Sequence, residues 1–182
     1  MKRIILALSV IAISFCGTAQ EAGYRTTDVG GSFQYSPDFN TYSLQLAFNA
    51  EEYHSFILKG NFARSGSRKT SNHTSESGSG WGAYLGYRYH FSVIPKRAFL
   101  GLGVGIQSMK MNWSLLLLEG TTNLTLLQPT VEAGYTLLIN DYMYITPSVS
   151  GILQTKLSSK GADVDFGSGF APAAGISIGW RF

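Results

Sequence analysis

The chain has 182 residues, of which 45% are hydrophobic and 14% are charged, and its formal net charge is +3. Lys2 and Arg3 are two of the fourteen basic residues, so the chain without them carries twelve basic against eleven acidic residues, a net of +1. This balance gives no basic surface of the kind that binds nucleic acid, and we expect no such partner. The length fits a single domain.

The first residues predict export. Residues 1–3 are basic, residues 4–15 form an apolar run, and residues 17–19 supply small side chains before the expected cleavage point. This is the pattern of a Sec-type signal peptide, and the apolar run is too short to cross a bilayer as a helix. We therefore expect a signal peptide over residues 1–19 and one domain over residues 20–182.

The chemistry available to that domain is limited. The only cysteine, Cys16, lies in the expected signal peptide, and Phe15 stands where a lipoprotein requires a small residue. We therefore expect no lipid anchor, disulfide or thiol nucleophile. The sequence also has no glycine-rich phosphate loop, cofactor fingerprint or metal-ligand cluster, so we expect neither a cofactor nor a metal.

Eight segments of the domain alternate bulky apolar residues with small or polar ones, as a strand with one apolar face does. Each approaches the roughly nine to eleven residues that a tilted strand needs to cross the apolar layer of a membrane. In the fifth, for example, Leu102 and Val104 alternate with Gly103 and Gly105. The segments are residues 28–36, 42–49, 56–62, 81–90, 100–107, 131–137, 143–153 and 174–182.

The expected connections between these segments differ in length in a regular way. The short turns are residues 50–52, 93–97 and 140–141, and the long stretches are residues 64–80, 109–123 and 156–169. In an up-and-down arrangement the short turns fall on one rim and the long stretches, with a turn at Pro37, fall on the other. Short turns opposite long loops are typical of membrane β-barrels.

The last nine residues have the pattern of a closing strand. One face is apolar and the opposite face is small or charged, which suits lipid on one side and a narrow lumen on the other. The apolar face holds Ile176, Ile178, Trp180 and Phe182, and the other holds Gly175, Ser177, Gly179 and Arg181.

Together, these features resemble the small outer-membrane β-barrel families of the OmpA-barrel, OmpX and opacity-porin kind. The resemblance covers nearly the whole expected domain. It implies an all-β, eight-stranded antiparallel up-and-down transmembrane barrel in the outer membrane of a Gram-negative bacterium. It also implies recognition by the barrel assembly machinery through the C-terminal strand that ends in Phe182. Fold alone says little about function.

Charged residues on the small, polar faces predict a network inside the barrel. The candidates are Lys59, Arg88, Glu132 and Arg181, with His90 nearby. Charges in a narrow lumen must pair, and we expect Glu132, as the only acid well inside a strand, to be the common anion. The network is either a plug or a constricted ion path, because eight strands leave an interior that side chains can fill.

Two external features are candidate binding sites. Arg64, Arg68 and Lys69 form a basic cluster that fits the phosphates of lipopolysaccharide. The stretch from Met109 to Leu127 predicts a long hairpin with an apolar edge or patch. Its candidate contacts are Trp113, Leu115 and Leu117. Alternatively, these residues face lipid, or the loop folds over the barrel mouth.

Catalysis is the less favoured interpretation. His54 and His90 lie near the expected periplasmic rim, and His73 lies in a Ser/Thr/Gly tract that is a poor scaffold for a catalytic triad. We therefore expect a non-enzymatic barrel with a structural, interaction or adhesion role through its external loops. The alternatives are a narrow porin-like channel, a lipid A-modifying barrel enzyme and a soluble barrel that binds a lipophile.

Overall fold

The computed structural model describes residues 27–50, 53–68, 75–92, 96–115, 118–139, 142–161 and 169–182. The expected signal peptide, residues 1–19, lies outside these ranges. In the described part of the chain, no helix is long and apolar enough to span a membrane.

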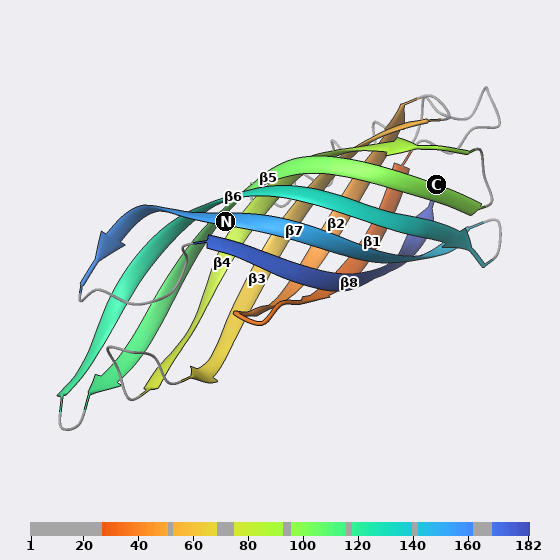
Figure 1. The fold of residues 1–182 in the computed structure, drawn as a ribbon. Helices are drawn as coiled ribbons and strands as arrows, with labels where there is room; N and C mark the ends of the chain where they lie inside the picture. The colour runs from red at the N-terminus through yellow and green to blue at the C-terminus, as the bar shows by residue number, and fades with distance from the viewer. Residues whose placement is uncertain are drawn as a thin grey trace, which may run out of the picture.

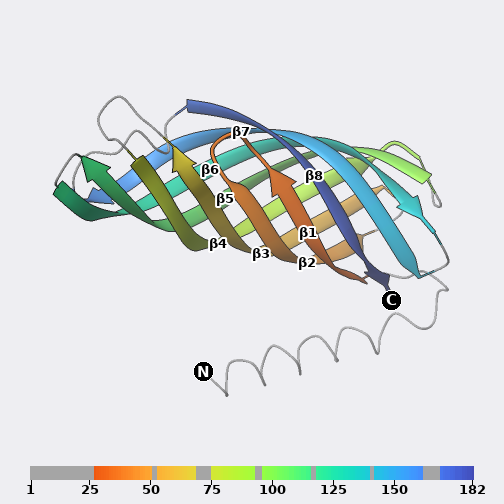
Figure 2. The ribbon, with the colours of Figure 1, turned by 90° about the horizontal axis from the view of Figure 1, so that it is seen from below.

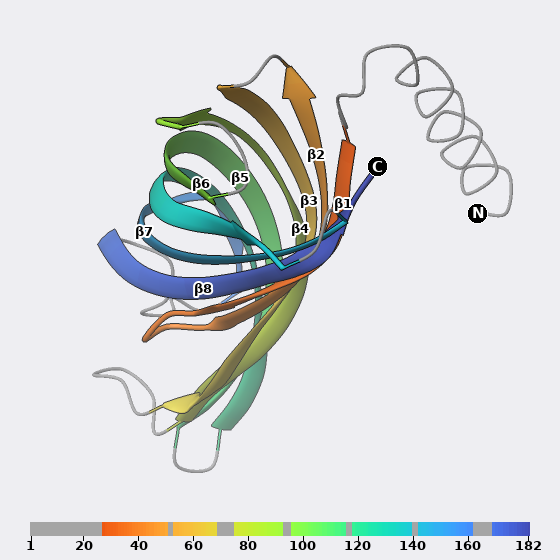
Figure 3. The same ribbon diagram turned by 90° about the vertical axis from the view of Figure 1, so that its right-hand side faces the viewer.

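Eight antiparallel strands form a closed barrel in sequence order (Figures 1 and 2). Strand β1 pairs with β2 on one side and with β8 on the other, which closes the ring (Figure 3). This confirms the predicted all-β up-and-down barrel. The strands are β1 (Thr27–Tyr35), β2 (Asn40–Ala50), β3 (His54–Arg68), β4 (Ser75–His90), β5 (Lys96–Leu115), β6 (Leu118–Leu138), β7 (Met143–Lys160) and β8 (Gly169–Arg181).

One part of the barrel, which we call the membrane belt, has apolar side chains outside and mainly polar or small ones inside. On β5, Leu102 is 59% exposed and Ile106 is 53% exposed, whereas Gly101 and Gly105 are buried. Lipid accepts such a surface, and the closed ring leaves no strand edge unpaired within the bilayer. The belt comprises residues 28–35, 42–48, 56–62, 81–89, 98–106, 129–137, 145–153 and 170–180.

Exposed aromatic side chains lie near both ends of the belt, as in membrane barrels with interfacial girdles. The connections β1–β2, β3–β4, β5–β6 and β7–β8 share one end of the barrel, which we call the hairpin end. Trp81 and Phe170 are 72% and 70% exposed near this end. Tyr142 and Trp180 are 56% and 52% exposed near the end that holds the C-terminus. The connections β2–β3, β4–β5 and β6–β7 lie at this second end, where Phe182 also pairs with Thr27.

The prediction that residues 64–80, 109–123 and 156–169 are long loops is wrong for most of their described residues, whereas the prediction of a long hairpin over Met109–Leu127 is confirmed. Most of these residues continue the strands, so that β5 has 20 residues and β6 has 21. Only residues 116–117 separate β5 from β6, and only residues 69–74 separate β3 from β4. The stretches looked like loops because their outward side chains are polar. The expected strands were identified by their outward apolar residues, so each one was ended where the outward residues become polar.

We call the continued strands the outer extension: residues 64–68, 75–79, 108–115, 118–127 and 155–160. Figure 1 shows the ends of β3 to β6 reaching beyond β1, β2 and β8 on the left, opposite the C-terminus. In this region the sidedness is reversed, because Lys110 and Asn112 are exposed whereas Met109 and Met111 are only 2% and 0% exposed.

The inward apolar side chains of the outer extension meet others from the adjoining belt. We call this cluster the apolar plug. It comprises Phe39, Ala63, Met109, Met111, Leu124, Leu126, Ile152, Ala171 and Ala173, and Trp113 packs against it. The hairpin end of the lumen is therefore closed by a hydrophobic core of the kind found in soluble proteins.

Candidate functional site

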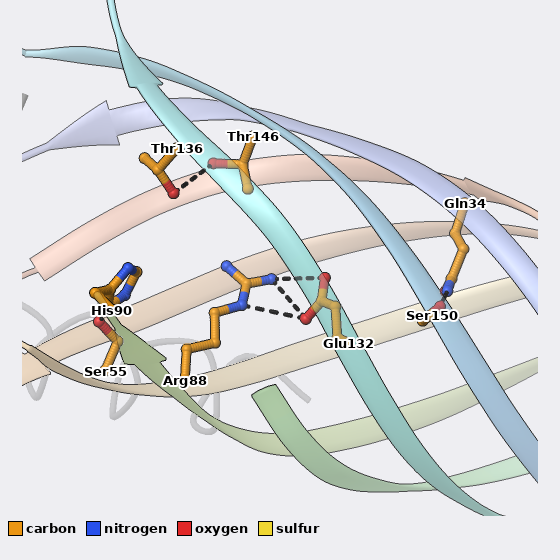
Figure 4. A network of polar contacts seen from close by, with 8 residues as sticks. All are labelled: Gln34, Ser55, Arg88, His90, Glu132, Thr136, Thr146 and Ser150. Carbon is orange, nitrogen blue, oxygen red and sulfur yellow. Dashed lines mark hydrogen bonds and ion pairs between the residues drawn. The ribbon is translucent and has the colours of Figure 1, made fainter. Parts of the chain in front are cut away.

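An ion pair crosses the middle of the lumen between β4 and β6. Arg88 Nη2 lies 3.0 Å from both carboxylate oxygens of Glu132, and Arg88 Nε lies 3.2 Å from Oε2 (Figure 4). Gly101 of β5 is the register partner of both residues. A Cβ at Gly101 would stand 3.2 Å from Arg88 Cγ, so the glycine leaves the space in which the guanidinium reaches across β5.

The surroundings of Arg88 fix it further. Its guanidinium carbon lies 4.4 Å from the ring centroid of Phe99, and the side chains of Arg88 and Glu132 are only 5% and 8% exposed. A bidentate pair at such depth is much stronger than a surface pair, and removing one partner leaves the other charge uncompensated.

The other two predicted members of the network lie apart from this pair. Lys59 of β3 stands over the ring of Tyr84, with Nζ 5.1 Å from its centroid, and it forms no ion pair within 4.0 Å with any described carboxylate. Arg181 does not reach Glu132. It binds Asp28 instead, through bonds of 2.6 and 2.7 Å between the paired strands β8 and β1.

The expectation that Glu132 is the common anion of the network is therefore wrong, because a second buried acid, Asp28 at the start of β1, takes Arg181. Asp28 begins the predicted first segment and shares its inward face with Gly30 and Ser32. That alternation was a usable signal, but the pairing with Arg181 follows only from the register that closes the ring. Glu76 is a further buried acid, at 0% exposure, in a stretch that was expected to be a loop.

A serine and a histidine meet at the end of the lumen near the C-terminus. Ser55 Oγ lies 3.0 Å from His90 Nε2 and donates to Asn49 Oδ1 at 2.6 Å (Figure 4 labels Ser55 and His90). His90 Nδ1 has no hydrogen-bond partner among the described residues, whereas a catalytic triad needs an acid there. Ser55 and His90 are 1% and 3% exposed, so both side chains are buried.

Two small cavities lie in the described part of the lumen. A cavity of about 40 Å³ lies between the apolar plug and Glu132, and another of about 10 Å³ lies beside Arg88, His90 and Arg181. About 10–15 Å³ is needed for one water molecule, so the larger cavity has room for roughly two to four. The ion pair separates the two cavities, since Glu132 lines one and Arg88 lines the other.

The predicted basic cluster is only partly placed by the structure. Arg64 is exposed on β3 beside a shallow polar depression of about 370 Å³. Arg68 ends β3 with its backbone opposite Glu76, and Lys69 lies outside the described residues. The structure therefore places the side chain of only one member of the basic cluster, Arg64, and only the backbone of a second, Arg68.

The predicted apolar edge on the hairpin is wrong for every side chain described there. Met109 and Met111 lie inside the apolar plug, and Trp113 is half-buried, with Nε1 donating to Thr122 Oγ1 at 3.2 Å. Leu115 ends β5, and Leu117 lies outside the described residues. No group of three or more His, Cys, Asp or Glu side chains in the described ranges is arranged to hold a metal.

Neither a protein-family model nor a curated protein matches this sequence. Ail, the attachment invasion locus protein of Yersinia pestis, has a similar structure, with 13% identity, a TM-score of 0.53, and coverage of 86% of this chain and 97% of that one. The N-terminal β-barrel domain of Pseudomonas aeruginosa OprF has 12% identity, a TM-score of 0.52 and coverage of 87% and 98%. A major outer membrane protein from Thermus thermophilus has 10% identity, a TM-score of 0.50 and coverage of 86% and 99%.

The class that the ring and its lumen define is the eight-stranded antiparallel membrane β-barrel. The solved structures confirm the resemblance in fold: this chain has the fold of the small outer-membrane β-barrels. At such low identity the likeness concerns the fold alone, so function has to be argued from the side chains of this chain.

Proposed function

We propose that this protein is a non-enzymatic barrel of the bacterial outer membrane, with a closed lumen, that presents its outer extension for interactions at the cell surface. The observation that carries the proposal is the reversal of sidedness along β5. Outward residues are apolar up to Ile106 and polar from Ser108 onward. Residues 108–115 then span about 26 Å of strand at roughly 3.3 Å per residue, which is much more than a turn requires.

The outward face of the extension suits polar contacts in water. It is built mainly of hydroxyl and amide side chains with a few charged residues, and its exposed members include Arg64, Ser79, Lys110, Asn112, Thr121 and Asn123. Such a face can form hydrogen bonds, as donor and as acceptor, with sugars, phosphates or a protein surface. Lipopolysaccharide beside Arg64 and an extracellular partner are thus both proposals for this surface.

The closed lumen favours a surface role over the alternative of a small-solute channel. A conducting path would have to displace the apolar plug and also break the pair between Arg88 and Glu132. Breaking a buried pair costs several kcal/mol unless new partners replace it. The buried pair of Ser55 and His90 likewise gives no support to an acyl-transfer enzyme, because it lacks both an acid and access.

The surface role is tested by removing polar groups from the outward face without touching the plug. Cells that express a Lys110→Ala, Asn112→Ala, Asn123→Ala triple variant should bind host-cell or lipopolysaccharide-coated surfaces less than wild-type cells. The matched control is Ser92→Ala, which removes an exposed hydroxyl at the opposite end of the barrel. Equal binding by all three strains would contradict a role for this face.

The closed lumen is tested separately in planar bilayers. The refolded protein should give no stable unitary conductance over the voltage range in which the bilayer is intact. Reproducible conductance steps that disappear in a variant with a larger plug, such as Ala173→Phe, would favour the channel instead.

A further inference from the structure

We propose that the lumen contains a binding site for one small monovalent inorganic anion, such as chloride, beside Lys59. The first observation is the local charge. In the middle of the lumen, Arg88 and Lys59 face one acid, Glu132. The buried cations Arg97 and Arg181 line the other cavity, where Arg181 binds Asp28. Both carboxylate oxygens of Glu132 are held by Arg88, so one positive charge is left over in the middle of the lumen.

Lys59 is partly buried, so solvent compensates its charge only in part. The apolar plug separates Lys59 from the hairpin end, and the Arg88–Glu132 pair lies toward the other end. In a region of low dielectric constant an uncompensated ammonium is strongly unfavourable. The contact with the Tyr84 ring offsets only part of that cost, because a cation–π contact is weaker than an ion pair.

The cavity of about 40 Å³ adjoins Lys59 directly. Its wall also carries Gln107 and Gln128, whose amide nitrogens have no hydrogen-bond partner among the described residues and whose side chains are only 2% and 8% exposed. Further hydroxyl donors are supplied by serines, threonines and Tyr84: the wall includes Thr41, Ser43, Thr130 and Ser150.

A cationic group, amide N–H groups and hydroxyls in one enclosure are the donors that an anion requires. Water alone would satisfy the amides and hydroxyls but would leave the charge of Lys59 uncompensated. The volume, roughly that of two to four water molecules, admits one halide with a water or two but is small for phosphate or sulfate. The geometry therefore selects a halide-sized monovalent anion.

The test compares stability in sodium chloride with stability in sodium gluconate at equal ionic strength, because gluconate is too large for the cavity. The folded protein in detergent should unfold at a higher urea concentration in chloride, with a saturable dependence that bromide reproduces. Lys59→Met should abolish the difference between the two salts. Arg64→Met, which removes an exposed cation from the same strand, should retain it.

If Lys59→Met does not fold, the double variant Gln107→Leu, Gln128→Leu keeps the cation and should weaken the chloride dependence about tenfold or more, since two hydrogen bonds to a charged group are lost. Crystals soaked in sodium bromide should show an anomalous peak within hydrogen-bonding distance of Lys59 Nζ. Equal unfolding midpoints in the two salts, or bromide-soaked crystals without that peak, would overturn the proposal.

Discussion

The membrane belt and the outer extension are built from the same strands but place their apolar side chains on opposite faces. On β5, Leu102 and Ile106 face outward below the change, whereas Met109 and Met111 face inward above it. The backbone pairing with β4 and β6 continues through the change without a shift in register on β5. The surrounding solvent, rather than the strand geometry, therefore decides which face is apolar.

The difference also explains how the lumen is divided. Where lipid surrounds the barrel, the interior holds polar groups that must satisfy one another, and ion pairs such as Arg88–Glu132 do so. Where water surrounds it, the interior packs as an ordinary hydrophobic core. The interior of the belt is thus stabilised by polar contacts and the interior of the outer extension by apolar packing. Substitutions of the same kind should therefore change the free energy of unfolding by different amounts in the two regions.

The largest effect is expected in the belt lumen. Glu132→Ala leaves Arg88 without its acid and should lower the free energy of unfolding by about 3–5 kcal/mol. The measurement is urea unfolding of the protein in lipid vesicles. Glu119→Ala, which removes an exposed acid at the other end of the same strand, is the control and should have little effect.

In the outer extension, truncation of a residue in the apolar plug should lower the free energy of unfolding by a comparable amount. Leu126 is 0% exposed, and Leu126→Ala should cost about 2–5 kcal/mol because it leaves a cavity in the apolar plug. Leu102→Ala deletes the same atoms from the lipid-facing wall, where lipid tails fill the space, and should cost clearly less. Equal losses in unfolding free energy would mean that Leu126 is not packed as the structure places it.

A charged residue should be unfavourable on the outward face of the belt and tolerated on the outward face of the outer extension. Leu102→Arg puts a cation against lipid tails and should cost about 2–4 kcal/mol. Asn112→Arg puts the same cation in water and should be nearly neutral, because Asn112 is exposed on the outer extension. A large loss for Asn112→Arg in the same vesicle assay would place the bilayer boundary above residue 112.

The smallest effect concerns one hydrogen bond. Trp113→Phe keeps a ring against the apolar plug but removes the N–H that donates to Thr122 Oγ1, and it should cost about 1 kcal/mol. Trp81→Phe, on the exposed wall of the belt, removes an N–H that has no such buried acceptor in the described chain and should cost less. A reversed order of the two unfolding midpoints would argue against an ordered Trp113 ring.

The belt was predictable from the sequence because alternation is strongest where one face meets lipid. Segments such as residues 42–49 and 100–107 coincide with parts of β2 and β5, and the ring order follows from the short turns. The same rule did not join residues 100–107 to the hairpin predicted over residues 109–127, since Ser108 and Lys110 are outward and polar. A search for alternation of either sign would have joined residues 100–107 to residues 108–115.

The site was only partly predictable. The inward alternation placed Arg88 and Glu132 on polar faces, but three cations were possible partners until the register was known. Asp28 and Arg181 lie 153 positions apart and meet only because β1 closes on β8. The burial of Met109 and Trp113 likewise depends on Phe39 and Ile152, which other strands and turns bring to the same place.

The central claim, that the surrounding solvent changes from lipid to water between Ile106 and Ser108 on β5, is tested most directly by cysteine scanning. The expected mature chain has no cysteine of its own. Single cysteines are placed at the outward positions 102, 104, 106, 108, 110 and 112, and intact cells are treated with a membrane-impermeant maleimide. We expect positions 108, 110 and 112 to be labelled and positions 102, 104 and 106 to be protected. Labelling that is uniform along β5, or that is confined to the lower positions, would contradict the account.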